Sequence, residues 1–311
     1  MKKIYISVVV PLYRCSASIA QLSNRLVETL QSITSDFEII LVNDASPEND
    51  WEKVQEQTAS DQRIKGVNLS RNFGQHYAIH AGLKHATGEW IVVMDGDLQD
   101  QPEEIPAFLE RAKEGYDIVL GRRVERQDNF LKKNMSKWFY KTLAYLTDTE
   151  QNAEVANFGI YHRKVVNAIL SMKDKTRYFP AMVKWVGFSR TEIKVAHAAR
   201  EEGQSGYNFK ALLRLALNTI LSFSDKPLRL TVKLGIYISI FSFVFAIYTF
   251  IRALNGEIDV IGYSSLIISI WFLAGVIITL LGMLGLYIGR IFEQVKNRPT
   301  FIVEQLINFD E

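Results

Sequence analysis

Two long apolar runs constrain the fold of this chain more than any other feature. Leu234–Ile251 and Val260–Gly289 contain no charged residue. A helix needs about 20 predominantly apolar residues to cross the hydrocarbon core of a bilayer, and core helices of soluble proteins rarely stay apolar over such lengths. The mean hydropathy of the whole chain is only +0.02, so the remaining residues must be distinctly polar. The runs predict two transmembrane helices within residues 230–290, preceded by a globular domain formed by residues 1–206.

Basic residues flank the two apolar runs but are missing from the loop between them. Cytoplasmic loops of membrane proteins are enriched in Lys and Arg, and residues 255–263 contain neither. The sequence therefore predicts a multi-pass membrane protein with both termini and the globular domain in the cytoplasm. The basic residues on which this orientation rests are Lys226, Arg229, Lys233, Arg290, Lys296 and Arg298.

A second constraint is a short apolar run that ends in acids. Trp90–Met94 is typical of a buried strand in a parallel sheet. Asp95, Asp97 and Asp100 follow it directly. Open α/β sheets bind ligands at the carboxyl ends of their strands, and paired carboxylates suit a hard divalent cation such as Mg²⁺ or Mn²⁺. We therefore expect Asp95 and Asp97 to hold the metal of a nucleotide diphosphate; the alternative is a solvated acidic turn before the helix that begins at Pro102.

Apolar runs alternate with amphipathic ones along the globular domain, which predicts an α/β fold. A β-α-β order with short connections favours right-handed crossovers and a mostly parallel, Rossmann-like sheet flanked by helices. Ser18 and Gln21 form a capping-box pattern at the start of the first helix. Asp44 follows the second strand, where it either contacts a ligand or caps a helix that begins near Asn49. Besides Trp90–Met94, the expected strands are Ile4–Val10, Phe37–Val42, Ile64–Leu69, Asp117–Leu120 and Thr191–Ala196.

Basic and aromatic side chains recur in a rough helical rhythm between residues 122 and 145. Such a segment is typical of a helix that lies on an anionic membrane surface, and a solvated face over a core stripe is the alternative. No nucleic acid is expected as a partner, because the chain has no binding motif and its net charge is only +2. The amphipathic run Phe209–Ser224 predicts an interfacial helix and linker at 207–229. The single cysteine, Cys15, excludes an intramolecular disulfide.

Four ordered motifs carry a resemblance to a known enzyme family. They are PLY at Pro11–Tyr13, VNDAS at Val42–Ser46, SRNFG at Ser70–Gly74 and DGDLQDQPEEI at Asp95–Ile105. With these motifs the chain resembles the family 2 glycosyltransferases of GT-A fold. Within that family it is most similar to the membrane-anchored polyprenyl-phosphate glycosyltransferases, relatives of dolichol-phosphate mannose synthase and of bacterial undecaprenyl-phosphate glucosyltransferases. The resemblance extends over nearly the whole chain, including both apolar runs.

The resemblance implies inverting transfer of a single sugar from a nucleotide-diphosphate sugar, with a UDP-sugar favoured. The implied acceptor is polyprenyl phosphate, namely undecaprenyl phosphate on the cytoplasmic face of a bacterial inner membrane. Asp97, Glu154 and Asn157 are then expected to be catalytic, and Asp95 and Asp97 to bind Mg²⁺ or Mn²⁺. Nucleotide-sugar binding is expected of Pro11, Tyr13, Asp44, Arg71, Asp95 and Gln99, and acceptor-phosphate binding of Arg122, Arg126, Ser136, Arg200 and Ser205.

One segment, Glu154–Arg163, departs from the family pattern. Many relatives carry D-x-G-x-F-R-L in this place. This chain keeps an acid, Glu154, at the first position but has Asn157 where some relatives have a second acid. The resemblance therefore constrains the fold and the reaction class more strongly than it constrains the donor sugar or the catalytic carboxylate.

Two other functions stay open at this point. The altered segment would also suit a degenerate transferase that acts as a membrane scaffold or lipid-carrier binding protein. A processive polysaccharide synthase would use the same nucleotide site, but the chain lacks the Q-x-x-R-W signature, and two spans are few for a polymer channel. Packing of the membrane helices, or of the cytoplasmic tail at 291–311, would allow a homo-oligomer. Residues 300–303 would then form an extra strand that pairs between subunits.

Overall fold

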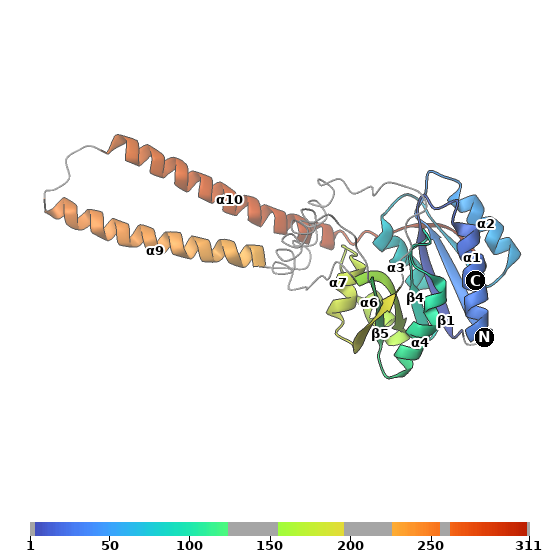
Figure 1. The fold of residues 1–311 in the computed structure, drawn as a ribbon. Helices are drawn as coiled ribbons and strands as arrows, with labels where there is room; N and C mark the ends of the chain where they lie inside the picture. The colour runs from blue at the N-terminus through green and yellow to red at the C-terminus, as the bar shows by residue number, and fades with distance from the viewer. Residues whose placement is uncertain (1–3, 124–154, 196–225, 256–261, 310–311) are drawn as a thin grey trace, which may run out of the picture. The chain divides into compact units, whose positions relative to one another are not determined.

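The computed structural model of the chain describes residues 4–123, 155–195, 226–255 and 262–309 (Figure 1). These residues belong to two compact units. The larger unit contains a β-sheet with its flanking helices and includes the carboxyl-terminal segment from Arg298 onward. The smaller unit contains the two long helices that precede this segment.

An eight-stranded mixed sheet forms the framework of the larger unit. Its strands are β1 (Ile6–Leu12), β2 (Phe37–Asn43), β3 (Ile64–Leu69), β4 (Trp90–Val93), β5 (Ile118–Arg123), β6 (Val155–His162), β7 (Arg190–Val195) and β8 (Val303–Ile307). Their order across the sheet is β7-β5-β6-β4-β1-β2-β3-β8. The four central strands, from β4 to β3, are parallel, so the predicted Rossmann-like core is confirmed. β6 is antiparallel to both β4 and β5, β7 is parallel to β5, and β8 is antiparallel to β3.

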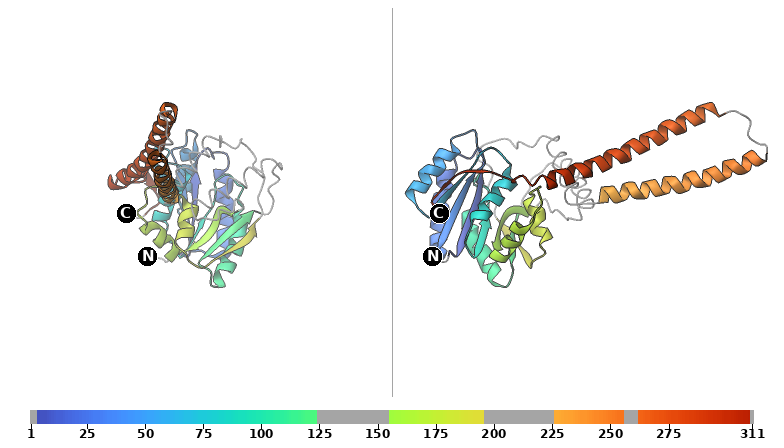
Figure 2. Two further views of the ribbon diagram at one scale, coloured as in Figure 1. Left: turned by 90° about the vertical axis from the view of Figure 1, so that its left-hand side faces the viewer. Right: turned by 180° about the vertical axis from the view of Figure 1, so that it is seen from behind.

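Helices cover both faces of this sheet (Figures 1 and 2). Successive strand residues point to opposite faces, and in β1 Val8 and Val10 pack in one hydrophobic core while Val9 packs in the other. The first core lies under α1 (Ile19–Ile33), α2 (Asp50–Ser60) and α4 (Ile105–Lys113), which follows the short 3-10 helix η1 (Pro102–Glu104). The second core lies under α3 (Gln75–His85), α6 (Arg163–Ser171) and α7 (Phe179–Trp185).

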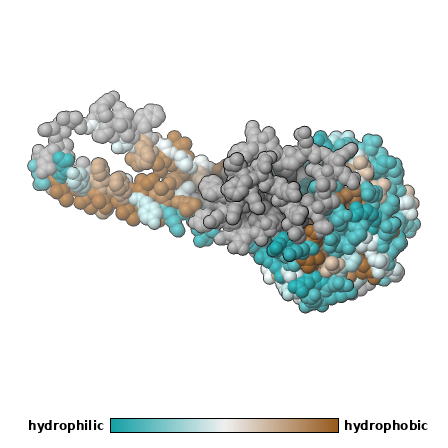
Figure 3. Space-filling model, viewed as in Figure 1, coloured by the Kyte–Doolittle hydropathy of each residue, from teal (hydrophilic) through white to brown (hydrophobic). Residues whose placement is uncertain are grey.

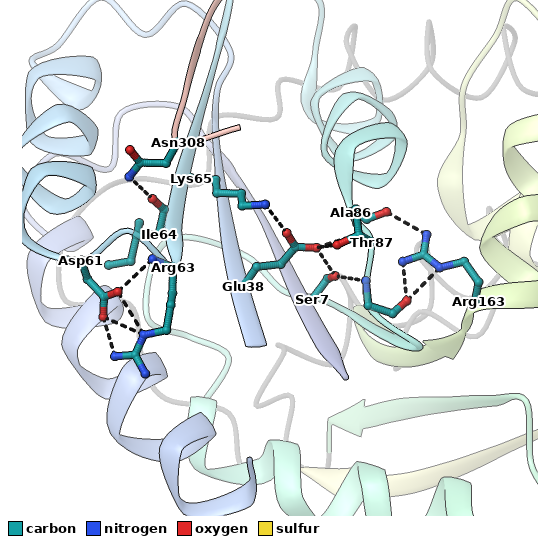
Figure 4. A network of polar contacts seen from close by, with 11 residues as sticks. Ser7, Glu38, Asp61, Arg63, Ile64, Lys65, Ala86, Thr87, Arg163 and Asn308 are labelled. Atoms are coloured by element: carbon teal, nitrogen blue, oxygen red, sulfur yellow. Dashed lines mark hydrogen bonds and ion pairs between the residues drawn. The ribbon is translucent and has the colours of Figure 1, made fainter. Parts of the chain in front are cut away.

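A buried polar network joins the amino ends of the central strands (Figure 4). Glu38 in β2 is only 1% exposed, and its Oε1 accepts hydrogen bonds from the Ser7 hydroxyl and the Thr87 amide, each at 2.6 Å. The ammonium group of Lys65 in β3 lies 2.7 Å from Glu38 Oε2. Three neighbouring strands are thus joined through one buried carboxylate.

The carboxyl-terminal segment supplies the edge strand β8. This strand pairs with β3 of the same chain, and Phe301 and Phe309 beside it pack against the second core. Asn308 fastens the segment further, because its Nδ2 donates to the carbonyl oxygens of Thr58 and Ile64, both at 2.8 Å. Figure 4 shows the bond to Ile64. The tail therefore forms a strand, as expected, but at Val303–Ile307, and this strand pairs within the chain. Pairing between subunits stays a prediction.

The smaller unit consists, among the described residues, of α9 (Lys226–Leu254) and α10 (Tyr263–Val295). Each contains a window that is apolar enough to cross a membrane, Leu228–Phe245 with a hydropathy of 1.6 and Phe272–Val295 with 2.2. No residue of either window is buried in the structure, and Figure 3 shows apolar side chains on the surface of these helices. A core helix of a soluble protein would be mostly buried, so this exposed apolar surface fits two membrane spans. The interfacial helix expected at Phe209–Ser224 lies outside the described residues.

Candidate active site

Four loops follow the carboxyl ends of the parallel strands β1 to β4 and meet at one edge of the sheet. These edge loops consist of residues 13–18, 44–49, 70–74 and 94–101. Hydrogen bonds join these loops to the neighbouring strands. For example, the Asp44 amide donates to the carbonyl oxygen of Leu12, the last residue of β1, at 3.0 Å. Ligands of open α/β sheets bind at this kind of edge.

Asp44 follows β2 as predicted, and its carboxylate is engaged by another edge loop. The Phe73 and Gly74 amides donate to Asp44 Oδ1 and Oδ2, each at 2.8 Å. Burial raises the pKa of Asp44, which is 2% exposed, and the two amide donors partly offset this rise. The alternative role as a cap of the helix near Asn49 was wrong: α2 has Asn49 as its N-cap residue and no side-chain cap bond, and the Asp44 carboxylate binds amides just before α3 instead. Asp44 therefore fixes the loop that leads into α3.

The acidic loop after β4 is held by polar contacts on both sides. Gln75, at the start of α3, donates from Nε2 to Asp95 Oδ1 at 2.6 Å. The Asp100 carboxylate, which is 2% exposed, accepts a hydrogen bond from the Asp95 amide at 3.1 Å. Asp97 Oδ1 accepts one from the Gln99 amide at 3.2 Å. Asp95 and Asp97 are only partly buried, so solvent and ligands can reach their carboxylates.

The residue between the two aspartates is glycine, and the acidic loop passes close to β1 at this point. A Cβ atom at Gly96 would lie 2.6 Å from Leu12 Cδ2 and 3.2 Å from the Pro11 carbonyl oxygen. The Gly96 carbonyl oxygen also accepts a hydrogen bond from the Ser18 hydroxyl at 2.6 Å. The capping box predicted at Ser18 was therefore wrong: α1 has no side-chain cap bond, and the hydroxyl instead ties the acidic loop to the start of α1.

Three edge loops contain a non-glycine residue in the left-handed backbone region. Arg14, Ala45 and Leu98 have φ angles of 58°, 48° and 62°. Such conformations cost about 1–3 kcal/mol each, persist only where their surroundings hold them, and concentrate at functional sites. At Arg14 the stabilising contact is a hydrogen bond from its amide to the Ser46 hydroxyl oxygen at 3.0 Å. The edge loops are thus shaped before a ligand arrives.

The other residues predicted to bind the nucleotide sugar differ in exposure. Tyr13 is 42% exposed, and Arg71 is also exposed, with its guanidinium carbon 4.6 Å from the centre of the Phe73 ring. Pro11 is buried in β1, and Gln99 is partly buried. Tyr13 and Arg71 can therefore touch a ligand directly, whereas Pro11 shapes the edge from within.

Two of the predicted catalytic and acceptor residues besides Asp97 lie in the described part of the chain. β6 runs antiparallel to β4 with Gly159 opposite Val93, which directs Asn157 past the carboxyl end of β4, toward the edge that carries Asp95. Arg122 is exposed near the carboxyl end of β5, which is antiparallel to β6 and so ends at the same edge. The predicted residues that lie outside the described ranges are Glu154, Arg126, Ser136, Arg200 and Ser205.

The acidic loop fits a hard divalent cation. Asp95 and Asp97 offer the carboxylate oxygens that Mg²⁺ and Mn²⁺ prefer. In the part of the chain that the structure describes, no group of three or more His, Cys, Asp or Glu side chains forms a complete metal site. A cation held here would therefore need oxygens from a phosphate-bearing ligand or from water as well, which is the usual situation for Mg²⁺ at nucleotide sites.

Gln75, Asp50 and Asp100 support the edge loops, although no role was assigned to them from the sequence. Asp50 is fully buried at the start of α2, and its Oδ2 accepts a hydrogen bond from the Cys15 amide at 3.0 Å. The sequence contained a signal for the supporting roles of two of them: Asp50 is an acid in the first turn of a helix, and Asp100 is an acid close to the Asp95–Asp97 pair. The role of Gln75 had no such signal, because its contact with Asp95 spans 20 residues.

The Cys15 thiol is expected to react slowly in the folded protein. Burial is the main reason that its pKa is raised to about 11, and the nearby carboxylates of Asp50, Asp97 and Asp95 add to the effect. Since the thiolate is the reactive form, labelling by an aromatic disulfide at about pH 8 should be at least about tenfold slower than after unfolding. Cys15 is the sole cysteine, so the unfolded protein gives the reference rate directly. Equal rates in both states would contradict this prediction.

Comparison with known proteins places this site in a family. The profile described as Glycosyl transferase family 2 matches residues 7–170, a range that contains all the edge loops. An uncharacterized glycosyltransferase of Synechocystis is 37% identical over 304 residues, which cover 97% of this chain and 96% of that protein. The undecaprenyl-phosphate 4-deoxy-4-formamido-L-arabinose transferase of Proteus mirabilis is 32% identical, over 97% of this chain and 94% of its own. The bactoprenol glucosyl transferase of Shigella phage SfII is 34% identical, over 96% and 97%.

A solved structure shares the fold of the larger unit. It is the glucosyl-3-phosphoglycerate synthase of Mycobacterium tuberculosis in complex with Mn²⁺, uridine diphosphate and phosphoglyceric acid. The TM-score is 0.51 at 13% identity, over 70% of this chain and 77% of that one, so the likeness concerns the fold alone and agrees with the expected GT-A architecture. The profile spans just over half of the chain, and the relatives match nearly all of it. The chain therefore belongs to glycosyl transferase family 2 and is itself a glycosyltransferase.

Proposed function

We propose that this glycosyltransferase transfers a single sugar from a nucleotide-diphosphate sugar, preferably a UDP-sugar, to undecaprenyl phosphate. The observation that carries the proposal is the presence in one chain of an acid-bearing sheet edge, with Asp95 and Asp97, and of two exposed apolar helices. The edge suits a soluble phosphorylated donor and the helices suit a membrane-bound acceptor. The names of two relatives, which refer to undecaprenyl phosphate and to bactoprenol, support the same acceptor class.

The donor is assigned to the edge loops. Asp95 and Asp97 would hold Mg²⁺ or Mn²⁺, and when bound the ion stabilises negative charge on the leaving diphosphate. Tyr13 and Arg71 are exposed and would contact the nucleotide, while Asp44 holds the loop that carries Arg71. The complex of the fold neighbour with Mn²⁺ and uridine diphosphate supports this class of donor.

The acceptor needs orientation more than deprotonation. The second pKa of a phosphate monoester is about 6, so the lipid phosphate is mostly a dianion at neutral pH. One of its oxygens attacks the anomeric carbon, the bond from that carbon to the diphosphate oxygen breaks, and the nucleoside diphosphate leaves with inversion of configuration. No proton has to be removed, so Asn157 can stand where some relatives have an acid. We assign the orientation of this phosphate to Arg122, together with Arg126, Ser136, Arg200 and Ser205.

The sheet topology supports a membrane hairpin. β8, which follows α10, pairs with β3, which precedes α9, so the chain must return to the side of the membrane that it left. The basic residues that flank the apolar helices favour the cytoplasm as that side. We therefore place the catalytic domain and both chain ends in the cytoplasm, with residues 230–290 in a bacterial inner membrane.

The proposal is tested with purified full-length protein, undecaprenyl phosphate in vesicles, Mn²⁺ and a panel of nucleotide sugars. Mass spectrometry follows the lipid-linked product and the released nucleotide. We expect one donor to yield lipid that carries a single sugar. Turnover should stop when EDTA removes the metal and return when Mn²⁺ or Mg²⁺ is restored, because the described residues by themselves offer too few ligands to retain the ion.

The alternative functions give different products in the same assay. A processive synthase would make polymer. A scaffold or lipid-carrier binding protein would release no nucleotide with any donor, while a known polyprenyl-phosphate glycosyltransferase remained active in the same vesicles. Either result would contradict transfer of a single sugar.

A further inference from the structure

A chain of hydrogen bonds runs from β8 across the carboxyl edge of the sheet. The Asn68 Nδ2 in β3 donates to Glu304 Oε2 in β8 at 3.1 Å. The Asn43 Nδ2 in β2 donates to Asn68 Oδ1 at 2.8 Å, and Asn43 Oδ1 accepts a hydrogen bond from the Ser46 amide at 3.2 Å. Residues from three neighbouring strands thus lead to the edge loop at 44–49. We refer to Glu304, Asn68, Asn43 and Ser46 as the amide relay.

The chemistry of the first residue sets the direction of every bond in the amide relay. A carboxylate only accepts hydrogen bonds, whereas each side-chain amide has one donating and one accepting end. Glu304 therefore turns the donating end of Asn68 toward itself and leaves its oxygen facing Asn43. Asn43 must in turn present its own donor to Asn68, and its oxygen faces the Ser46 amide. If the carboxylate were replaced by a donor, every amide in the series would have to reverse.

The far end of the amide relay holds the strained part of the edge loops. The Ser46 hydroxyl oxygen accepts hydrogen bonds from the amides of Arg14, at 3.0 Å, and Glu48, at 3.3 Å. Arg14 and the Ala45 next to Ser46 are two of the residues with left-handed backbone. The relay therefore ends at Ser46, whose hydrogen bonds help to hold the left-handed conformations of the loops after β1 and β2.

The segment leading into β8 reaches a third edge loop independently. The Ser70 amide donates to the Ile302 carbonyl oxygen at 3.1 Å. Ser70 begins the loop whose Phe73 and Gly74 amides bind the Asp44 carboxylate. The carboxyl-terminal segment thus reaches the loop at 70–74 directly and the loop at 44–49 through the amide relay.

We propose that Glu304 is a positioning residue for donor binding, acting through the amide relay from a strand that follows the membrane helices. This inference rests on the proposed function, because it takes the edge loops to bind the nucleotide. Glu304 itself does not touch the donor; it fixes the orientation of Asn68 and Asn43 and so keeps the Ser46 loop in its binding shape. Its effect should therefore appear in the affinity for nucleotide and not in the affinity for the lipid acceptor.

A swap of relay residues tests the proposal. In Glu304→Lys a donor replaces the carboxylate, so Asn68 must turn its oxygen toward position 304 and every amide of the relay reverses. In the double variant Glu304→Lys with Asn68→Asp, the new aspartate accepts from both the lysine and Asn43, so the original direction is restored. The single change Glu304→Gln keeps an acceptor for Asn68 and should behave like the wild type. The readout is the Kd of the full-length protein for uridine diphosphate with Mn²⁺, measured by calorimetry, together with KM for the donor and for undecaprenyl phosphate.

We expect Glu304→Lys to weaken nucleotide binding by about 3- to 10-fold, the typical effect of one hydrogen bond, and the double variant to restore it. KM for the donor should follow Kd, and KM for undecaprenyl phosphate should stay constant. Asn308→Asp is the matched control, because it removes hydrogen bonds of the same segment to Thr58 and Ile64, outside the relay. It should lower the thermal midpoint and leave Kd unchanged.

Each other outcome overturns a specific claim. An unchanged Kd in Glu304→Lys, or a double variant as weak as the single one, would reject the positioning role of Glu304. If Asn308→Asp weakened nucleotide binding equally, nucleotide affinity would depend on attachment of the carboxyl-terminal segment to the sheet and not on the relay. If Glu304→Lys fails to fold, Glu304→Ala removes the acceptor from the exposed end of the relay, and an unchanged Kd there would reject the role as well. Absence of nucleotide binding in the wild type, with any nucleoside diphosphate, would instead reject the proposed function.

Discussion

Replacement of Asp97 with asparagine is expected to lower kcat/KM for sugar transfer by about 100- to 1,000-fold, the usual effect of removing one group that stabilises charge in a transition state. The substitution removes one of the two carboxylates proposed to hold the divalent cation. Asparagine has the same size, and its oxygen can still accept the hydrogen bond from the Gln99 amide. A loss of activity would therefore report the charge of Asp97 and not the shape of the loop. Steady-state rates at increasing Mn²⁺ concentrations measure it, and the apparent KM for Mn²⁺ should rise in parallel.

Asp61→Asn is a matched control for this experiment. Asp61 precedes β3 at the opposite edge of the sheet, where it forms an ion pair with Arg63 at 2.6 Å. A solvent-accessible pair of this kind contributes only about 0–1 kcal/mol, so the variant should keep its activity. If Asp97→Asn retained more than about a tenth of the wild-type kcat/KM, the metal role of Asp97 would have to be abandoned.

Replacement of Glu38 with alanine is expected to lower the free energy of unfolding by about 3–5 kcal/mol, as when one partner of a buried ion pair is removed. The change leaves the Lys65 ammonium, 18% exposed, without its carboxylate. It also removes the acceptor for the Ser7 hydroxyl and for the Thr87 amide and hydroxyl (Figure 4). Thermal unfolding of the detergent-solubilised protein, followed by near-UV circular dichroism, gives the shift in midpoint.

Glu56→Ala provides the comparison for Glu38→Ala. Glu56 pairs with Lys53 on the surface of α2 at 2.8 Å, and both side chains are exposed. Loss of such an exposed pair costs about 0–1 kcal/mol. A shift for Glu38→Ala no larger than that for Glu56→Ala would show that the buried network does not stabilise the sheet.

Acid should reduce the difference between the wild type and Glu38→Ala. Burial alone would raise the pKa of Glu38, but the ion pair with Lys65 and the hydrogen bonds from Ser7 and Thr87 outweigh it and hold the pKa below its ordinary 4.5. A carboxylate with a lowered folded-state pKa stabilises the fold fully above its unfolded-state value and loses this contribution as the pH falls through the folded-state value. The gap between the two midpoints should therefore be widest above pH 4.5 and narrow below it.

Local sequence patterns predicted the centre of the fold and the place of the candidate site. Apolar runs of strand length marked β1 to β4, and parallel pairing then required their carboxyl ends to share one edge. That requirement alone brought Asp44 and the Asp95–Asp97 pair to the same side of the sheet. Such information is local, because a buried strand and the polar residue that follows it are adjacent in the chain.

Features that depend on distant partners could not be predicted in this way. Ser18 matches a capping box locally, yet its hydroxyl donates to Gly96, 78 residues away. β6 follows no connection pattern that would reveal its antiparallel insertion between β4 and β5. The pairing of β8 depends on an edge of β3 that is left open by the order of the other strands.

Closure of the sheet by β8 has a consequence for biosynthesis. Asn68 in β3 and Glu304 in β8 are 236 residues apart, and at a synthesis rate of about 5–20 residues per second the ribosome needs roughly 10–50 s to cover that distance. Throughout this interval β3 presents an unpaired edge, which is prone to aggregation, while α9 and α10 leave the ribosome. The last strand can join the sheet only after both apolar helices have been made, so delivery of the nascent chain to the membrane comes before the catalytic unit is complete.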